Sequence, residues 1–396
     1  MGELASFALP KWIDSNKDNS TLALAGSAAP SLSLQDLIDL STDKETTSAN
    51  LSIQSLKLSL GPFDGSKPLR QQIAALYDDS VTAEHIFPTH GTTGANALLL
   101  QSLLKPGDHV IAMYPCYTQL ISLPKSVPGV EVSYWTLGLQ DEAQANIQQL
   151  QELIRPNTKM IILNNPNNPL GSILPLTTAH EIVNLSRTHG LTVLVDEIFR
   201  PLFHAEVTPP SFISLSTPAD KIIVTSSMSK AWGLSGTRIG WLATLNTSIL
   251  TQCSDRGLYT TMALSSIDSV IATEALSDRC RPQILTRHLD IAQRNIALLD
   301  AFVESRKGLC EWVRPAAGGT AFIRFLDGER RPVDDVVFCR ALQEKKGVLL
   351  APGSLCFGTR GAEDFRGYVR VHITVDPGVM EKSLVAIGEF LDESPE

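Results

Sequence analysis

The sequence predicts an α/β fold, in which a mostly parallel central sheet is followed by a smaller α+β domain at the C-terminal end. Three observations predict this fold. Short β-rich runs alternate with helical patterns from about residue 85 onward. A long amphipathic pattern over Arg287–Arg306 then begins a region with a different order of elements. The chain has 396 residues, 43% of them hydrophobic, which is enough for two domains with a sizeable core.

The expected elements follow one another along the chain. Strands are expected at His109–Met113, Met160–Leu163, Leu191–Val195 and Lys221–Thr225, and helices at Gly94–Leu104, Glu142–Ile154 and Thr177–His189. After Arg287–Arg306 come Thr320–Phe325, Val333–Glu344, Val348–Leu350, Tyr368–Thr374 and a last helix over Pro377–Leu391. The polar stretch Ser31–Asn50 is expected to be rich in loops. The predicted organisation is an arm over residues 1–45 that packs on the small domain, a large domain over 46–285 and a small domain over 286–396.

Charge and composition exclude several classes of protein. The formal net charge of −9 disfavours nucleic acid as a partner, because phosphate backbones attract basic surfaces. The six cysteines show no CxxC or paired metal spacing, so neither a metal site nor a disulfide framework is expected. Met1–Lys17 has no basic region before an apolar run, and no segment approaches the roughly 18 apolar residues of a membrane span. We therefore expect a cytoplasmic protein that does not bind membranes.

Four successive predicted strands are each followed by a residue that carries useful chemistry. Tyr117, Asn168, Asp196 and Lys230 follow the four strands in that order. Ligands of open α/β sheets bind outside the carboxyl ends of the strands, so these side chains are expected at one edge. The set suits a phosphorylated pyridine aldehyde, pyridoxal 5'-phosphate (PLP). It offers a ring for stacking, a donor for the phenolate oxygen, an anion for the ring nitrogen and an amine for the aldehyde.

Lys230 is predicted to bind this aldehyde as a Schiff base. It lies in a turn rich in Ser and Gly after an apolar strand, and Arg238 is the only other charged residue between Ile222 and Ser254. A nearby cation and partial desolvation lower the pKa of an ammonium group, and only the free amine attacks an aldehyde. A solvated surface lysine is the alternative interpretation of this residue.

A phosphate site is predicted at the start of the helix that follows residue 90. Exposed N–H groups and hydroxyls at a helix N-terminus bind anions, although an ordinary N-cap is the alternative. A guanidinium adds charge-assisted hydrogen bonds to a dianion. The residues expected around the phosphate are Thr92, Thr93, Ser227, Ser229 and Arg238.

Three further candidates each have a structural alternative. Asp196 is placed to pair with a protonated pyridine nitrogen, but a helix cap or a satisfied buried acid has the same sequence pattern. Asn168 stands in a run of Asn and Pro and can simply shape a turn. Arg370 alternates on a predicted strand, so it points either into the cleft or to the surface.

The chain resembles the class I/II aminotransferases, which are PLP-dependent enzymes of fold type I (aspartate-aminotransferase-like). The strongest match is Ser227-Met228-Ser229-Lys230 with Arg238-Ile239-Gly240, which is similar to the family's S-x-S-K-x7-R-x-G signature. Further pieces fall in family order: Gly61-Pro62 with Gly65 and Leu69-Arg70, Lys105-Pro106-Gly107-Asp108, Asn168-Pro169-Leu170-Gly171, Asp196-Glu197-Ile198-Phe199, the run from Ala317 to Phe322, and Ala351-Pro352-Gly353-Ser354. Each motif is short, but their shared order is specific and covers nearly the whole chain from about residue 22.

The resemblance implies a role for each candidate. Lys230 would form the internal aldimine and shuttle a proton between Cα and the cofactor. Asp196 would hold the pyridine nitrogen, Tyr117 would stack on the ring, and Asn168 would bond the phenolate oxygen. Arg370 would bind the α-carboxylate of an amino-acid substrate. The resemblance also implies a homodimer with active sites at the subunit interface.

Three departures from the family pattern bear on the reaction. Leu60 stands where the family has a tyrosine that reaches the partner's phosphate, and Phe199 stands where a tyrosine bonds the phenolate oxygen. Leu170 replaces the threonine of the NPTG motif. The PLP assignment survives these changes, whereas the missing hydroxyls also favour PLP reactions other than a standard transamination.

Several functions therefore stay open. The first is an aminotransferase that acts on an L-amino acid through an external aldimine and Cα deprotonation. The second is another PLP reaction on the same fold. Elimination, replacement and an amino-acid cyclisation of the capreomycidine-synthase type are the candidates. A regulator built on this fold is disfavoured, because such proteins carry an N-terminal DNA-binding domain and only about 20 residues precede the resemblance. A nicotinamide-dependent oxidoreductase is disfavoured because no GxGxxG follows a strand.

Overall fold

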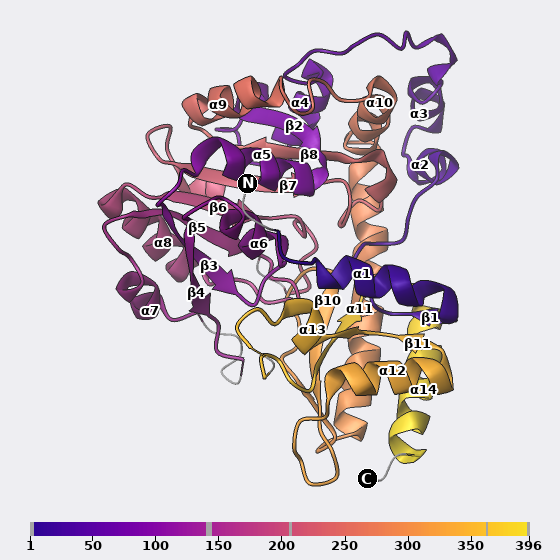
Figure 1. The fold of residues 1–396 in the computed structure, drawn as a ribbon. Coiled ribbons are helices and arrows are strands. Elements are labelled where there is room, and N and C mark those ends of the chain that lie inside the picture. The colour runs from indigo at the N-terminus through magenta and orange to yellow at the C-terminus, as the bar shows by residue number, and fades with distance from the viewer. Residues whose placement is uncertain (1–3, 140–144, 206–207, 362, 394–396) are drawn as a thin grey trace.

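The computed structural model describes residues 4–139, 145–205, 208–361 and 363–393. Its largest sheet has seven strands in the order β2-β8-β7-β6-β5-β3-β4 (Figure 1). These strands are β2 (Ile86–His90), β3 (His109–Tyr114), β4 (Glu131–Thr136), β5 (Thr158–Asn164), β6 (Thr192–Asp196), β7 (Ile222–Ser227) and β8 (Ile239–Ala243). The strands from β4 to β7 pair in parallel, whereas β8 pairs antiparallel with both β7 and β2.

Helices flank this sheet. They are α4 (Lys67–Ala74), α5 (Gly91–Leu103), α6 (Gln119–Lys125), α7 (Ile147–Glu152), α8 (Leu176–His189), α9 (Thr247–Gly257) and α10 (Ser266–Ala275). Helix α5 packs on β7 and β8, and α8 packs beside β6. Every residue of β3, β6 and β7 is buried, as is typical of parallel strands that are covered on both faces. Helix α8 ends at Gly190, whose φ of 65° suits the left-handed cap.

A second, smaller unit follows α11 (Arg281–Ser305), a long helix that runs alongside both sheets in Figure 1. It contains a four-stranded antiparallel sheet in the order β12-β13-β10-β9. Its strands are β9 (Cys310–Trp312), β10 (Thr320–Phe325), β12 (Ala351–Pro352) and β13 (Tyr368–His372), and its helices are α12 (Asp335–Lys346), α13 (Gly353–Phe357) and α14 (Pro377–Glu393). Helix α14 packs against α11 and α12.

The N-terminal segment contacts both units. Helix α1 (Ala8–Asn16) packs on α13, and β1 (Leu22–Ala23) pairs in parallel with β11 (Val348–Leu349). Farther along, α2 (Leu34–Leu40) and α3 (Lys44–Asn50) pack on each other, and α3 contacts α10. The N-terminal segment therefore passes from the small unit to the helices beside the large sheet (Figure 1).

The prediction that Ser31–Asn50 is rich in loops is wrong, because this stretch contains both α2 and α3. The polar residues that suggested loops are helix caps. Ser33 and Asp36 form a reciprocal capping box at the start of α2, and the side chain of Asp43 accepts from the N–H of Thr46 in α3. Polar composition alone did not distinguish a capped short helix from a loop.

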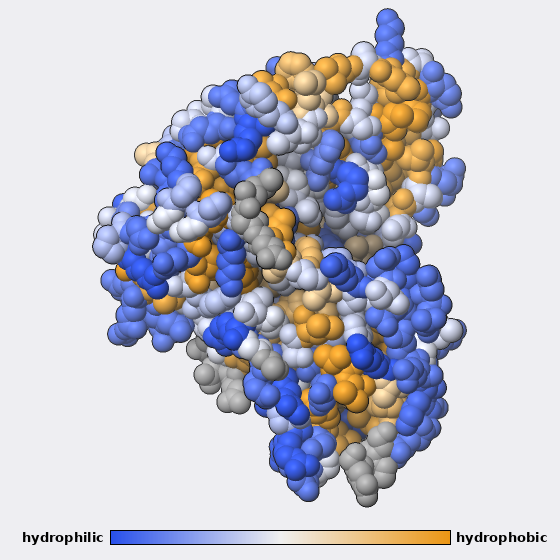
Figure 2. Space-filling view, viewed as in Figure 1, coloured by the Kyte–Doolittle hydropathy of each residue, from blue (hydrophilic) through white to orange (hydrophobic). Residues whose placement is uncertain are grey.

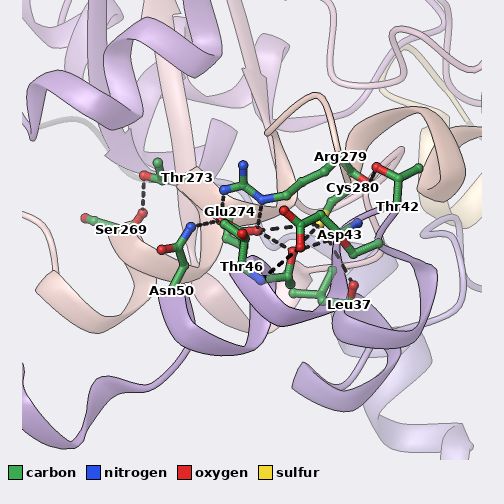
Figure 3. A network of polar contacts seen from close by, with 12 residues as sticks. Leu37, Thr42, Asp43, Thr46, Asn50, Ser269, Thr273, Glu274, Arg279 and Cys280 are labelled. Carbon is green, nitrogen blue, oxygen red and sulfur yellow. Dashed lines mark hydrogen bonds and ion pairs between the residues drawn. The ribbon is translucent and has the colours of Figure 1, made fainter.

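A buried polar network ties α3 to α10 (Figure 3). Glu274 Oε1 accepts from Arg279 Nε at 2.7 Å and from Thr47 Oγ1 at 2.6 Å, and Oε2 accepts from Asn50 Nδ2 at 2.9 Å. Burial opposes ionisation of Glu274, but these hydrogen bonds hold its pKa below the ordinary value. The carboxylate thus stays charged and fixes the N-terminal segment to the large unit.

The four expected strands and the α/β architecture are confirmed as β3, β5, β6 and β7. The sequence did not predict β2, β4 or β8. The expected helix Glu142–Ile154 is shorter, and residues 142–144 lie outside the described residues. All six cysteines are free and buried. Within the described ranges, no helix combines the length and the apolar character needed to cross a membrane.

Candidate active site

A cavity of about 1020 Å³ lies at the carboxyl ends of the parallel strands. Strand β13 and the N-terminal segment 26–31 also contribute to its walls. Nine of the ten predicted site residues line this cavity: Thr92, Thr93, Tyr117, Asn168, Asp196, Ser229, Lys230, Arg238 and Arg370. The tenth, Ser227, lies behind the wall, where its Oγ accepts from the N–H of Ser229 at 3.2 Å. The fold therefore gathers residues that are up to 278 positions apart in the sequence.

Asp196 is the last residue of β6 and is almost fully buried, with 2% of its surface exposed. Its Oδ2 accepts from Asn96 Nδ2 at 3.2 Å, and its Oδ1 accepts from the N–H of Ile198 at 3.1 Å. Burial raises the pKa of Asp196 to about 6, against the opposing effect of these hydrogen bonds and of Lys230. Because burial disfavours the charged form of Asp196, a cation inside the cavity would stabilise its carboxylate strongly.

Lys230 follows β7 and reaches the cavity with a half-buried side chain. Its Nζ donates a hydrogen bond to Ser27 Oγ at 2.8 Å. Burial lowers the pKa of Lys230 to about 8; Arg370 and Arg238 act in the same direction, whereas Asp196 opposes them. About a tenth of the lysine is therefore the free amine at pH 7, far more than for an ordinary lysine, and the free amine is the form that attacks a carbonyl carbon.

The start of α5 and Arg238 form a concave, positively charged part of the cavity. Arg238 adopts a left-handed conformation with a φ of 52°, and its Nη1 donates to the carbonyl of Ser235 at 2.9 Å. Gly91 has a φ of 67°, and a Cβ there would lie 2.6 Å from Arg238 Nη2. The Thr92 hydroxyl is buried and has no hydrogen-bond partner within the described ranges. Helix N-termini and guanidinium groups both favour anions, so this region is suited to a phosphate.

Strand β13 contributes Arg370 and His372 to the cavity; they are two residues apart and hence lie on one face of the strand. Arg370 is 1% exposed; its Nη1 donates to Asn168 Oδ1 at 3.1 Å, and its Nη2 donates to the carbonyl of Ala25. Its Nε has no partner within the part of the chain that the structure describes. Burial lowers the pKa of Arg370 to about 10, so the group is still a cation that lacks an anion.

His372 is neutral. Its Nε2 lies 2.8 Å from the carbonyl oxygen of Ala28 and therefore carries the proton, because a carbonyl can only accept. Burial lowers the pKa of His372 to about 3, and the cations Arg370 and Lys230 act in the same direction. His372 thus adds no positive charge to the cavity and instead fixes the N-terminal segment at Ala28.

Tyr117 and Phe199 contribute aromatic surface to the cavity. The ring of Tyr117 lies 5.2 Å from the ring of Phe7, with 59° between their planes. Phe199 is 1% exposed, and its ring packs so closely on Gly318 that a Cβ there would lie 3.3 Å from Phe199 Cγ. Phe199 therefore lines the cavity without offering a hydroxyl.

The cavity residues that sequence reasoning missed include Ser27, Asn96, Gln119 and His372. Asn96 is one turn beyond Thr92 in an otherwise apolar stretch of α5, which is a signal that could have been used. His372 shares the strand face of Arg370, so period-two spacing also indicates it. Ser27 carries no local signal, because its contact with Lys230 joins residues 203 positions apart.

Comparisons with known proteins agree with this geometry. Residues 34–387 match the family model for aminotransferase class I and II. The chain belongs to this family. It is therefore a PLP-dependent enzyme of fold type I, as the sequence motifs predicted.

Individual relatives span most of the chain. A PLP-dependent aminotransferase from Streptococcus suis 89-1591 has a similar structure, with a TM-score of 0.89 and 34% identity over 99% of this chain and 98% of that one. The capreomycidine synthase of Streptomyces vinaceus is 26% identical over 84% of this chain and 80% of its own length. Human tyrosine aminotransferase is 24% identical over 90% of this chain and 78% of its own length.

The residues present fit PLP. The unpartnered Thr92 hydroxyl and the Gly91–Arg238 contact leave a concave anion site that a phosphate suits, and Asp196 and Lys230 share the same cavity. A second glycine supports the anion site, because a Cβ on Gly240 would lie 2.3 Å from the carbonyl carbon of Gly91. The glycines therefore allow β8 and the start of α5 to approach closely enough to place Arg238 beside the helix N-terminus.

Proposed function

We propose that the chain is an aminotransferase that removes the Cα proton of an L-amino acid and releases a 2-oxo acid. When bound, PLP supplies an aldehyde that condenses with amines and a ring that withdraws electrons from Cα. The single observation that carries the proposal is Lys230, whose pKa of about 8 leaves a basic amine in a cavity shared with Asp196 and Arg370.

In this proposal each residue of the cavity has one task. Lys230 links to the cofactor and then, as a free amine, accepts the Cα proton. Asp196 pairs with the protonated ring nitrogen and keeps it protonated. Tyr117 covers one face of the ring, and Asn168 offers its amide N–H groups, because Arg370 occupies its oxygen. The phosphate is held by Thr92, Thr93, Ser229 and Arg238, and Ser227 supports their loop.

Arg370 is proposed to bind the α-carboxylate of the substrate. Its guanidinium is buried and oriented by Asn168 and Ala25, and its unpartnered Nε leaves it able to bond further. A guanidinium binds a carboxylate through two parallel hydrogen bonds, which fixes orientation as well as charge. A substrate held in this way presents its Cα hydrogen to the cavity that contains Lys230.

Amino-acid cyclisation or elimination is a second candidate function, favoured by two observations. The similarity to a capreomycidine synthase extends over most of the chain, and Phe199 lines the cavity without a hydroxyl. Both candidate functions begin with loss of the Cα proton. They differ in the fate of the amino nitrogen. Transamination transfers it to a 2-oxo acid acceptor, whereas cyclisation or elimination needs no such acceptor.

A panel of amino acids with and without 2-oxo acids tests the proposed function. An aminotransferase gives ping-pong kinetics and no net turnover without an acceptor. Formation of more than one equivalent of product per active site without an acceptor refutes transamination and supports the second candidate. Lys230→Ala should abolish the covalent link that borohydride reduction traps, and persistence of this adduct would show that Lys230 is not the attachment site.

We also propose that the chain forms a homodimer. Large apolar side chains are exposed in two neighbouring segments, where Ser266 Oγ donates to the carbonyl of Ser59 at 3.3 Å. Leu58 is 76% exposed and Tyr259 is 92% exposed. Figure 2 shows hydrophobic residues gathered at this end of the molecule, around α3 and α10. An exposed cluster of this kind favours a partner surface, and light scattering after gel filtration tests the mass of the assembly.

A further inference from the structure

Ser27 is the hydrogen-bond partner that the structure records for the amine of Lys230, and it comes from a distant segment. The Lys230 Nζ to Ser27 Oγ distance is 2.8 Å, which lies within the usual range for a nitrogen donor. Ser27 itself is 7% exposed and lines the cavity. The contact therefore lies inside the site, where little water competes for the amine.

The backbone around Ser27 is fixed on both sides. The carbonyl of Ala25 accepts from Arg370, and the carbonyl of Ala28 accepts from His372 Nε2 at 2.8 Å. The N–H of Ala29 donates to the carbonyl of Lys230 itself at 3.0 Å. These bonds attach the segment to β13 on one side and to the lysine loop on the other, so the backbone that carries the Ser27 hydroxyl is held beside the amine.

Gly319 makes this placement possible. A Cβ on Gly319 would lie 2.4 Å from the carbonyl oxygen of Ser27, which is far closer than any real contact. The backbone of Ser27 therefore packs directly on a residue that has no side chain. The Gly319 carbonyl in turn accepts from the N–H of Ile373 at 3.0 Å, which connects this contact to the end of β13.

We propose that Ser27 is a positioning residue for Lys230, which holds its free amine in place while the amine accepts the Cα proton of the substrate. This inference rests on the proposed function of Lys230 as the base. The Cα–H bond breaks, its electron pair stays with the carbon, and the proton forms a new N–H bond that makes the amine an ammonium. The ammonium is a stronger donor than the amine, so the bond to Ser27 Oγ strengthens as the proton arrives.

The first experiment follows capture of PLP by the cofactor-free full-length protein as a function of pH. Ser27 accepts from Nζ and so favours the protonated lysine; Ser27→Ala should move the midpoint of capture about one pH unit lower, the shift expected for the loss of one hydrogen bond to a charged group. Ser27→Thr keeps the hydroxyl and should restore the wild-type midpoint. Ser41→Ala is the matched control, because Ser41 is 6% exposed and its hydroxyl accepts from Thr47 Oγ1 and from the N–H of Asp43, neither of which lines the cavity.

The second experiment follows turnover. Ser27→Ala should lower kcat about tenfold or more at an unchanged KM, and should raise the kinetic isotope effect of a Cα-deuterated amino acid, because proton transfer becomes more rate-limiting. If Ser27→Ala does not fold, Ser27→Cys replaces it as an isosteric side chain with a poor hydrogen-bonding group.

The results separate this proposal from the proposed function. A capture midpoint and an isotope effect that match those of Ser41→Ala would overturn the role of Ser27, as would a fall in KM and kcat that Ser27→Thr does not rescue. If no amino acid loses its Cα proton in the wild-type protein, the proposed function fails, whereas the pH dependence of PLP capture still decides whether Ser27 positions the amine.

Discussion

Replacing Asp196 by Asn should stabilise the cofactor-free protein and weaken the cofactor-loaded one. Burial raises the pKa of this carboxyl from its ordinary value of 3.8 to about 6, which corresponds to about 3 kcal/mol of lost folding free energy at neutral pH. The amide carries no charge and removes this cost. It also loses one of the two accepted hydrogen bonds, from Asn96 or Ile198, which costs about 1 kcal/mol. We therefore expect a net stabilisation of about 2 kcal/mol.

The sign of this effect depends on pH. A carboxyl whose pKa is raised in the folded state is protonated in both states well below pH 3.8, so its cost grows as the pH rises from 3.8 to about 6 and is constant above that. Urea unfolding of cofactor-free wild-type and Asp196→Asn proteins at pH 4 and pH 8 measures this difference. Greater stability of the variant at pH 8 and none at pH 4 is expected. A variant that is destabilised equally at both values would refute the argument that burial strains this carboxyl.

Other parts of the site and fold give predictions of defined sign. Arg370→Gln removes a cation that lowers the pKa of Lys230, so the pH midpoint of cofactor capture should rise, and KM for the amino acid should increase at least tenfold. Glu274→Ala leaves Arg279 without its partner and should destabilise the protein by about 3 kcal/mol at pH 7. The carboxylate has a lowered pKa, so this loss should fade in urea titrations as the pH falls below 4.5. Gly91→Ala places a Cβ against Arg238 and should weaken PLP binding measured by equilibrium dialysis; because Gly91 has a φ of 67°, the alanine should also lower thermal stability.

The centre of the site could be predicted because it follows a regular rule. Asp196 ends β6 directly, and its neighbours in register are Asn164 of β5 and Thr225 of β7. Parallel strands bring their carboxyl ends to one edge, so strand runs in the sequence place the residues after them without further information. The same rule explains why Lys230, which follows β7, lies in the same cavity as Asp196.

The rest of the site depends on contacts that the sequence does not encode locally. Ser27 bonds to Lys230, which is 203 positions away in the sequence, and its neighbour Ala28 bonds to His372, which is 344 positions away. Such pairings follow from how the two sheets and the N-terminal segment pack, and no periodicity near Ser27 indicates them. Strand β8 was not predicted for a similar reason. Its antiparallel pairing with β7 departs from the strand–helix alternation that the sequence shows.

The charges of the cavity explain why both candidate reactions share one binding mode. Lys230, Arg238 and Arg370 face a single buried carboxylate, Asp196, in a chain whose net charge is −9. Burial shifts Lys230, Arg370 and Asp196 toward their neutral forms, with pKa values of about 8, 10 and 6. In the proposed function, a substrate carboxylate pairs with the buried guanidinium of Arg370, and a phosphate pairs with the more exposed Arg238. In the proposed function this binding mode would be common to transamination and cyclisation, and the nitrogen acceptor would separate the two.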